Sequence, residues 1–210
     1  MCGFVGYVND TPDKSVNEKI IKDMADRIRH RGPDQDDYYV DSSVSLGFRR
    51  LSIIDLDGGS QPILNEDGTK VLVFNGEIYN YQPIREELIK KGHVFRTKTD
   101  SEVLLHGYEE YGCELLNKLR GMFAFVIWDS TEKKLFGARD IFGIKPFFYY
   151  LKNGNFLFGS EIKSFLSNPL FEKELNEERL PDYLCFEYIP TTETMFKNVY
   201  KMEPGSYFTF

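Results

Sequence analysis

Residues 1–7, MCGFVGY, place a cysteine directly after the initiator methionine. Removal of Met1 makes Cys2 the chain terminus, so that one residue carries both a thiol nucleophile and an α-amine. Because an α-amine ordinarily has a pKa of about 7.7–8.0, it can act as the base for its own side chain, and no separate His or Asp is needed. Gly3 leaves room beside the sulfur, and Gly6 allows backbones to approach closely. The alternative is that Cys2 is a small buried hydrophobe, the usual role of a free cysteine.

Length and composition predict one folded domain. The chain has 210 residues, of which 41% are hydrophobic and 15% aromatic, enough for a substantial core. A formal charge of −7 argues against nucleic acid or an anionic membrane as a partner. No run of about 18 apolar residues is present to span a bilayer. The N-terminus lacks the basic-then-apolar pattern of a secretion signal, so we expect a cytoplasmic protein.

The cysteines and histidines give no disulfide or metal pattern in the sequence. The three cysteines are an odd number without close spacing. The three histidines are scattered, and no pair has metal-ligand spacing. We therefore expect no disulfide framework, no zinc site and no papain-like Cys/His pair, unless folding brings distant residues together. The residues concerned are Cys2, Cys113 and Cys185, and His30, His93 and His106.

Four segments have the periodicity or boundary residues of helices. The first begins at Ser15-Val16-Asn17-Glu18, which fits a capping box. A second is expected over 80–91, before a glycine that suits a helix C-terminus. A third begins at Thr99-Asp100-Ser101-Glu102, another capping-box pattern, and continues to residue 111. A shorter helix is expected over 161–166.

Short strands in hairpins account for most of the remaining chain. They show apolar runs or alternate apolar and polar residues, and turn residues separate them. Because strands follow one another without regular βαβ alternation, we expect an α+β fold of antiparallel sheets with helices outside. The expected strands are 2–8, 36–41, 44–49, 70–74, 122–128, 135–140, 147–151, 156–159 and 207–210.

Polar residues that could take part in catalysis or substrate binding lie at the ends of these predicted elements. They are Cys2, Arg50, Asn75-Gly76-Glu77 and Asp100. Each has a purely structural alternative, since Asn75-Gly76 fits a hairpin turn, Asp100 fits a helix cap and Arg50 fits a surface charge. The segment Arg29–Asp34 fits either a charged turn or part of a site.

Together these residues suit an amino-acid amide as substrate. Attack by the Cys2 sulfur on an amide carbonyl requires donors for the developing oxyanion. The Asn75 side chain and the Gly76 N–H are donors of that kind. The planar guanidinium of Arg50 suits a carboxylate, and the carboxylates of Asp100 and Glu77 suit an ammonium group.

Several short motifs follow one another along the chain. They are Met-Cys-Gly at 1–3, Arg-His-Arg-Gly-Pro-Asp at 29–34, Arg-Leu-Ser-Ile-Ile-Asp at 50–55, Asn-Gly-Glu-Ile-Tyr-Asn at 75–80, Thr-Asp-Ser-Glu at 99–102, Gly-Met-Phe-Ala-Phe at 121–125 and Arg-Asp-Ile-Phe-Gly-Ile-Lys-Pro at 139–146. In this order and spacing they resemble class II glutamine amidotransferases, and most closely the glutaminase domain of glutamine-hydrolysing asparagine synthetases. The matching motifs run from residue 2 to about 166, and Pro204-Gly205 resembles the close of that domain. Several motifs at family spacing are far more specific than any one alone.

The resemblance implies the N-terminal-nucleophile hydrolase fold over residues 1–210, a four-layer αββα sandwich of two antiparallel sheets. It implies that Cys2, after removal of Met1, attacks the side-chain amide of L-glutamine while its α-amine shuttles the proton. A thioester forms, ammonia leaves, and water releases glutamate. The resemblance assigns Asn75 and Gly76 to the oxyanion hole, and Arg50, Leu51, Ser52, Ile53, Ile54, Glu77 and Asp100 to glutamine binding.

Two features limit what this chain is expected to do alone. Asparagine synthetases carry a second, ATP-using domain with a Ser-Gly-Gly-x-Asp-Ser pyrophosphate loop, and no such loop occurs here. We therefore expect ammonia production without activation of aspartate, with no cofactor in this domain and with ATP and magnesium implied only for the absent one. While Met1 remains attached, the Cys2 nitrogen is an amide and cannot be the base, so we expect that form to be inactive.

Three functional hypotheses remain open at this point. The leading one is a glutaminase that supplies ammonia to an ATP-using synthetase domain for asparagine synthesis, in cis or on a separate chain. A related one keeps the glutaminase and changes the acceptor to a sugar or a cell-wall carboxylate. The third is a non-catalytic scaffold, which the presence of the nucleophile and the glutamine-binding residues weighs against.

A homodimer is compatible with the sequence. The aromatic residues within 142–150 fit a core strand, or in part a face toward the absent domain.

Overall fold

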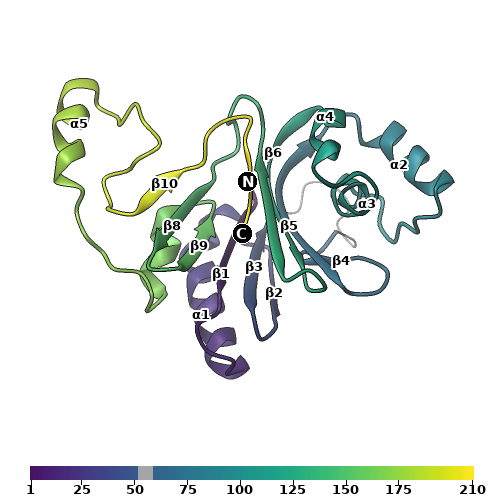
Figure 1. The fold of residues 1–210 in the computed structure, drawn as a ribbon, viewed down its shortest axis with the longest axis horizontal. Coiled ribbons are helices and arrows are strands. Elements are labelled where there is room, and N and C mark those ends of the chain that lie inside the picture. Colours follow the sequence, from purple (N-terminus) through teal and green to yellow (C-terminus); the bar gives the residue numbers. More distant parts are fainter. Residues whose placement is uncertain (52–58) are drawn as a thin grey trace.

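The computed structural model describes residues 1–51 and 59–210, which form two stacked sheets with helices outside (Figure 1). The larger sheet has six strands in the order β10-β8-β9-β1-β3-β2, and the smaller has five in the order β11-β7-β6-β5-β4. The strand pairings in both sheets are antiparallel. The predicted α+β class and the αββα sandwich are confirmed.

The strands fall close to their predicted positions. The hairpin partners predicted at 36–41 and 44–49 pair with each other, as do those at 122–128 and 135–140. The six-stranded sheet contains β1 (Gly3–Val8), β2 (Gln35–Val40), β3 (Val44–Arg50), β8 (Phe148–Lys152), β9 (Asn155–Gly159) and β10 (Val199–Lys201). The five-stranded sheet contains β4 (Ile63–Leu64), β5 (Lys70–Ile78), β6 (Gly121–Asp129), β7 (Lys134–Arg139) and β11 (Tyr207–Thr209).

The helices lie on the outer faces of the two sheets. Packing contacts join α1 to β1 and β3 of the six-stranded sheet, and α3 to β5 of the five-stranded sheet. The predicted helix at 161–166 is a 3₁₀ helix, Ile162–Ser167. The α-helices are α1 (Lys14–Asp26), α2 (Tyr81–Lys90), α3 (Glu102–Tyr111), α4 (Leu115–Lys118) and α5 (Leu180–Phe186). Shorter 3₁₀ helices cover Arg29–Arg31, Gly112–Glu114 and Glu177–Arg179.

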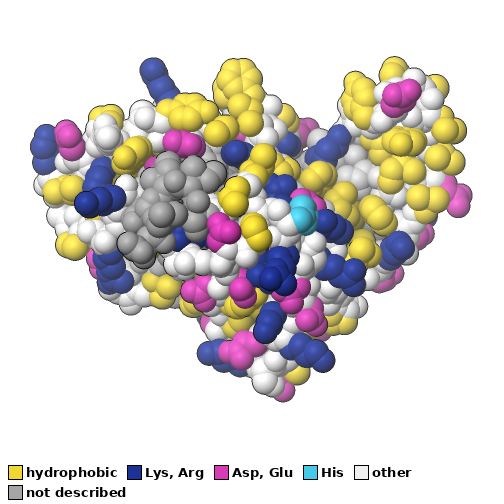
Figure 2. All heavy atoms as spheres, turned by 180° about the vertical axis from the view of Figure 1, so that it is seen from behind, with side chains coloured by type: hydrophobic (Ala, Val, Ile, Leu, Met, Phe, Trp, Pro, Cys, Tyr) yellow, Lys and Arg dark blue, Asp and Glu magenta, His cyan; other side chains and the backbone are white. Residues whose placement is uncertain are grey.

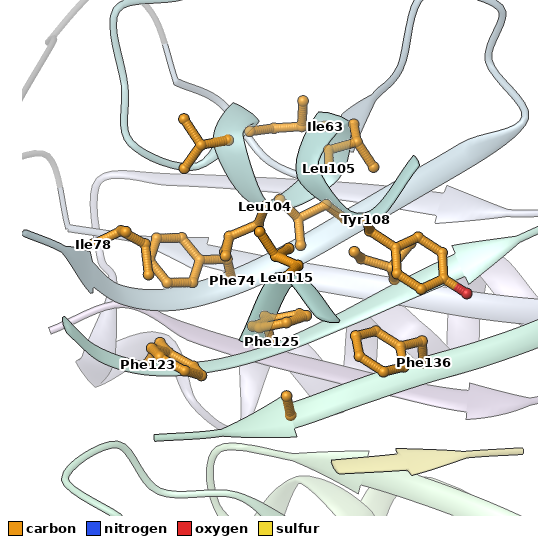
Figure 3. Close-up of a cluster of buried hydrophobic side chains, with 14 of the residues drawn as sticks. Ile63, Phe74, Ile78, Leu104, Leu105, Tyr108, Leu115, Phe123, Phe125 and Phe136 are labelled. Atoms are coloured by element: carbon orange, nitrogen blue, oxygen red, sulfur yellow. The ribbon is translucent and has the colours of Figure 1, made fainter. Parts of the chain in front are cut away.

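Three apolar layers hold the sandwich together, and strand alternation explains them. In β1, Phe4 faces the layer between the sheets, whereas Val5 and Tyr7 face α1. In β5, Val73 faces the layer between the sheets, whereas Phe74 faces α3. The third layer, between the five-stranded sheet and α2 to α4, is shown in Figure 3. Because successive side chains of a strand point to opposite faces, one strand contributes to two layers.

Strand β5 continues past the predicted end at Phe74. Asn75 and Gly76 lie inside the strand, opposite Ala124 and Phe123 of β6. The hairpin-turn alternative for Asn75-Gly76 is therefore wrong. A side chain at Gly76 would not fit there, since a Cβ would lie 2.2 Å from the Met122 carbonyl oxygen.

The two predicted capping boxes are wrong in detail. Helix α1 begins two residues earlier than Ser15 implies, and its cap is Asp13, whose carboxylate accepts from the N–H groups of Ser15 and Val16. At α3 the cap position is Ser101, which makes no side-chain cap hydrogen bond. The Glu102 carboxylate turns instead to the preceding loop and accepts from the N–H groups of Arg96 and Thr97, at 2.9 and 2.7 Å.

The aromatic run at 142–150 divides between core and surface. Phe147 and Tyr150 are fully buried, and Phe148 and Tyr149 are half-buried. Phe142 is 79% exposed, so it does not belong to the core strand. Within residues 1–51 and 59–210, no helix has the length and apolar character needed to cross a membrane.

Candidate active site

A cavity of about 160 Å³ opens where the start of β1 and the ends of β3 and β5 meet the loop before α3. Its lining brings together Cys2, Arg50 and Leu51 from the six-stranded sheet and its edge with Gly76 and Glu77 from β5 and with Asp100. These residues are far apart in the sequence and were all predicted as site residues. The remaining described lining residues are Phe48, Gly59, Gln61, Phe74, Tyr81, Lys98, Thr99 and Ser101.

Cys2 lies immediately before β1 and is partly buried. Its sulfur is 3.4 Å from the Leu51 backbone nitrogen, which donates to it, and 3.6 Å from the Leu51 carbonyl oxygen. The Cys2 carbonyl oxygen accepts a 2.9 Å hydrogen bond from Arg31 Nε. Both sides of the residue are thereby fixed by segments distant in the chain, which orients the thiol toward the cavity that it lines.

Arg31 links Cys2 to the carboxylate of Glu161. Its Nη1 donates to Glu161 Oε1 at 3.0 Å, and His30 Nε2 lies 2.9 Å from the same oxygen. A Cβ at Gly3 would lie 2.9 Å from the Arg31 side chain, so glycine makes room for this contact. The segment Arg29–Asp34 begins with the 3₁₀ helix Arg29–Arg31 and supports the residue predicted as the nucleophile through Arg31.

Arg50 ends β3 and is only 6% exposed. Its Nη1 donates a 2.8 Å hydrogen bond to Gln35 Oε1, and Gln35 lies directly opposite Arg50 in the β2–β3 pairing. The surface-charge alternative for Arg50 is wrong. A buried guanidinium that lines a cavity is suited to bind a carboxylate there.

The edge of β5 directs one backbone donor into the cavity. The N–H groups of alternate residues point to the same side of a strand. At this edge the Phe74 N–H donates to Gln61 Oε1 at 2.6 Å, and the Ile78 N–H donates to Asp100 Oδ2 at 2.7 Å. Gly76 lies between these two residues and lines the cavity, so its N–H faces the cavity between the Gln61 and Asp100 side chains.

Asn75 is placed differently from its neighbour. Its side chain is buried, at 2% exposed, on the face of β5 opposite to that of Phe74, and it is absent from the described lining of the cavity. Among the described residues, its Nδ2 has no hydrogen-bond partner. A buried amide donor without a partner is costly in a resting protein. Such a donor is available to an oxyanion that forms next to it.

Asp100 lies in the loop before α3, and its helix-cap alternative is wrong because it bonds to β5 and the cap position is Ser101. Burial raises the pKa of Asp100 to about 6, the Ile78 N–H lowers it, and the charge of Glu77 raises it further. Glu77 is exposed at the rim. The two carboxylates together create a negative region that favours an ammonium group.

Sequence reasoning missed two residues that support this geometry. Gln61, 6% exposed, bonds both backbone groups of Phe74, donating through Nε2 to its carbonyl oxygen at 3.1 Å. No sequence motif singles it out. Gln35 could have been found, because the predicted hairpin of 36–41 with 44–49 extends to a pairing with Arg50. The predicted residues Ser52, Ile53 and Ile54 lie outside the described residues.

Comparison with known proteins places the chain in one family. It matches the model of the glutamine amidotransferase domain over residues 1–210. It is 49% identical over 213 residues to asparagine synthetase [glutamine-hydrolyzing] 1 of Bacillus subtilis, a match covering 100% of this chain and 33% of that protein. It is 40% identical over 166 residues to a probable asparagine synthetase [glutamine-hydrolyzing] of Dictyostelium discoideum, covering 78% of this chain and 30% of that protein.

A solved structure shares the fold. Glutamine phosphoribosylpyrophosphate amidotransferase from B. subtilis superposes with a TM-score of 0.65 at 19% identity, covering 83% of this chain and 45% of that one. This chain spans about a third of the length of the curated relatives it matches. The chain belongs to the glutamine amidotransferase domain family.

Proposed function

We propose that this domain, residues 1–210, hydrolyses glutamine to glutamate and ammonia with Cys2 as the N-terminal nucleophile. The observation that carries the proposal is that Cys2, Arg50, Gly76 and Asp100 line one cavity. The cavity thus combines a sulfur nucleophile with groups suited to both ends of an amino acid. Glutamine has a carboxylate, an ammonium group and an amide, and each has a matching partner there.

Arg50 and Asp100 orient the substrate. The guanidinium of Arg50 pairs with the α-carboxylate, and the carboxylate of Asp100, assisted by Glu77, pairs with the α-ammonium. Fixing both groups at once directs the side-chain amide toward the Cys2 sulfur. This positioning converts attack on the amide into an intramolecular step. Leu51 contributes the N–H that now contacts the sulfur at 3.4 Å, and Ser52, Ile53 and Ile54 complete the glutamine-binding segment.

The chemistry proceeds in two stages. With Met1 removed, the free α-amine of Cys2 takes the thiol proton, and the sulfur forms a bond to the amide carbon. The resulting oxyanion is stabilised by the Gly76 N–H and by the Asn75 amide. The carbon–nitrogen bond then breaks, and the amine returns its proton to the departing ammonia. Water attacks the thioester that remains, the amine takes the water proton and returns it to the sulfur, and glutamate leaves.

We propose that the ammonia passes to an ATP-using synthetase domain that makes asparagine from aspartate, in cis or on a separate chain. Support comes from the relatives named as asparagine synthetases, which are about three times as long as this chain. An acceptor of another type, such as a sugar or a cell-wall carboxylate, is the second candidate, since the acceptor would be selected outside this domain. ATP and magnesium belong to that synthetase activity and not to this domain.

An exposed apolar surface on α5 and the segment that follows it supports a partner domain. Leu184 is 72% exposed, Phe186 57% and Tyr188 60%. Figure 2 shows hydrophobic side chains gathered on the projecting lobe at the upper right, which carries α5. A contiguous apolar patch of this kind marks an interaction site, and we assign it to the synthetase domain. A non-catalytic scaffold would also use this surface to bind a partner. It would not need Cys2, so the presence of Cys2 favours the glutaminase.

Glutamate release by purified variants tests the proposal. Cys2→Ala is expected to abolish release while retaining the fold, as judged by circular dichroism and melting temperature. Cys113→Ala is the matched control, because Cys113 is an exposed free cysteine outside the cavity, and it is expected to retain wild-type activity. Glutamine hydrolysis by Cys2→Ala would overturn the assignment of Cys2 as the nucleophile.

A further inference from the structure

A second cluster of reactive side chains lies on the outer side of the five-stranded sheet. It is formed by Glu66 from the β4–β5 turn, His93 from the α2–α3 loop, and His106 and Glu109 from α3. One nitrogen or oxygen atom from each of these residues lies within 4.8 Å of those from the other three. None of the four lines the cavity at Cys2. The fold thus brings together two histidines whose sequence spacing shows no metal pattern.

The distances within this cluster fit the edges of a tetrahedron. His106 Nδ1 is 3.1 Å from Glu109 Oε2 and 3.4 Å from Glu66 Oε2. His93 Nδ1 is 3.9 Å from Glu109 Oε2, and all four ligand atoms lie within 4.8 Å of one another. Zinc bonds of about 2.0–2.2 Å to histidine nitrogen and carboxylate oxygen place tetrahedral ligand atoms roughly 3.3–3.6 Å apart. Small side-chain adjustments are enough to reach that geometry.

Each carboxylate is already oriented by a second hydrogen bond. Glu109 Oε1 accepts from Asn65 Nδ2 at 2.6 Å, which leaves Oε2 facing His106. Glu66 Oε1 accepts from the Val94 N–H at 3.0 Å, and Glu66 Oε2 faces the same imidazole. Hydrogen bonds of this kind to the non-coordinating atoms orient ligands in metal sites.

The histidines are also arranged as ligands. His93 Nε2 lies 3.6 Å from Glu110 Oε2, so a carboxylate supports the ring nitrogen that faces away from the cluster. His106 is 2% exposed, and its polar contacts lie on its Nδ1 side, since Nε2 has no partner among the described residues. A neutral imidazole has a single N–H, which cannot serve the two carboxylate oxygens that face His106 Nδ1 equally. A cation between the four groups would satisfy all of them.

We propose that Glu66, His93, His106 and Glu109 bind one Zn²⁺ ion, or a divalent ion with the same preference for nitrogen and oxygen ligands. Two imidazoles and two carboxylates form a donor set that zinc accepts in tetrahedral geometry. With four protein ligands the site has no open position, so its role is structural. This inference differs from the sequence-based expectation of a domain without metal, and it is independent of the glutaminase proposal.

The metal would fasten three segments to one another. It would join α3 to the β4–β5 turn and to the α2–α3 loop, which carries His93. The same loop carries Asp100, which contacts β5 and lines the cavity. Binding that is confined to the folded state adds to the free energy of unfolding, so zinc would stabilise the layer that positions Asp100.

Zinc titration of the 210-residue chain, after removal of metal by a chelator, tests this site. Calorimetry is expected to show one high-affinity equivalent in the wild type, with a rise in melting temperature. The free thiols could also bind zinc, so the titration is run in the Cys2→Ala, Cys113→Ala, Cys185→Ala background. Absence of a bound equivalent in this background would overturn the proposal.

Variants identify the ligands. His93→Gln and Glu66→Gln are expected to weaken zinc binding by at least about tenfold and to abolish the zinc-dependent rise in melting temperature. His30→Gln is the matched control, because His30 is a histidine outside the cluster, and it is expected to bind zinc as the wild type does. Both ligand variants replace groups less buried than His106, so their folds are expected to persist. Unchanged affinity in both, or an equal loss in His30→Gln, would contradict the assignment.

Discussion

The Asp100 carboxylate accepts a 2.7 Å hydrogen bond from the Ile78 N–H and so joins the loop before α3 to the last residue of β5. Burial, with a further contribution from Glu77, raises the pKa of this carboxyl to about 6. Above that pH the group is ionised in a place that disfavours its charge. A bound ammonium group would offset this cost, which connects the electrostatics of the cavity to substrate binding.

Asp100→Asn is expected to raise the KM for glutamine by roughly 10- to 100-fold, because a charged hydrogen-bonding partner is worth about 1.5–3 kcal/mol. The turnover number should change far less, since the reacting amide is at the other end of the substrate. Steady-state glutamate release at pH 8 measures both. Asp23→Asn, at an exposed position on α1, is the control. A KM equal to that of the wild type would remove Asp100 from the ammonium site.

The pH dependence of glutamine use should report the same group. As pH falls through about 6, Asp100 takes up a proton in the free enzyme and loses its attraction for the ammonium group. We therefore expect kcat/KM to fall on the acid side with a midpoint near that pH. A pH profile of initial rates checks this, and Asp100→Asn should lack the acid limb. An acid limb that persists unchanged in the variant would assign it to another group.

The free energy of unfolding is expected to fall over the pH range in which glutamine binding improves. Because the folded-state pKa of Asp100 lies above its ordinary value of 3.8, the folded state holds the proton more tightly, and stability is lost as pH rises from about 4 to about 6. Asp100→Asn keeps an acceptor for Ile78 and removes the charge. It should increase the free energy of unfolding by roughly 1–3 kcal/mol at pH 7.5, and by nearly nothing at pH 4. Urea unfolding at both pH values measures this, and destabilisation at pH 7.5 would contradict it.

Arg50→Lys tests the carboxylate partner. Lysine keeps the charge but cannot form the planar two-point contact and cannot bond Gln35 in the same way. We expect the KM for glutamine to rise by roughly tenfold or more, corresponding to about 1.4 kcal/mol, with a smaller effect on kcat. Arg27→Lys is the control, because Arg27 bonds Ser167 on the outer surface. An unaltered KM in Arg50→Lys would exclude bidentate binding of the substrate carboxylate by this residue.

The fold could be predicted well where local patterns decide it. Alternation in β3 and the apolar runs of β1 and β6 located strands within a residue or two, because burial on one face or both imposes those patterns. Helix starts were less accurate. Asp13 replaces Ser15 as the cap of α1, and Glu102 bonds a loop instead of closing a capping box. Several nearby polar residues can satisfy a helix terminus, and the tertiary structure selects among them.

Most residues of the site could be predicted from the sequence, but the contacts that hold them in place could not. Cys2, Arg50, Gly76 and Asp100 were identified from chemistry and from motifs, and the cavity that they share follows from the fold. Gln61 could not be predicted, because its contact with Phe74 depends on how the chain returns to the edge of β5. The same applies to His93 and His106, whose rings lie 5.1 Å apart although 13 positions separate them.

The central claim is that Cys2, freed of Met1, is the nucleophile of an assembled glutaminase site. The most direct test is the intact mass of the purified chain before and after incubation with the diazo-ketone analogue of glutamine derived from norleucine. The account predicts a chain that lacks Met1 and gains one adduct, located on Cys2 by peptide mapping and absent from Cys2→Ala. A chain that lacks Met1 and gains no adduct, or gains it at Cys113 or Cys185, would contradict the claim.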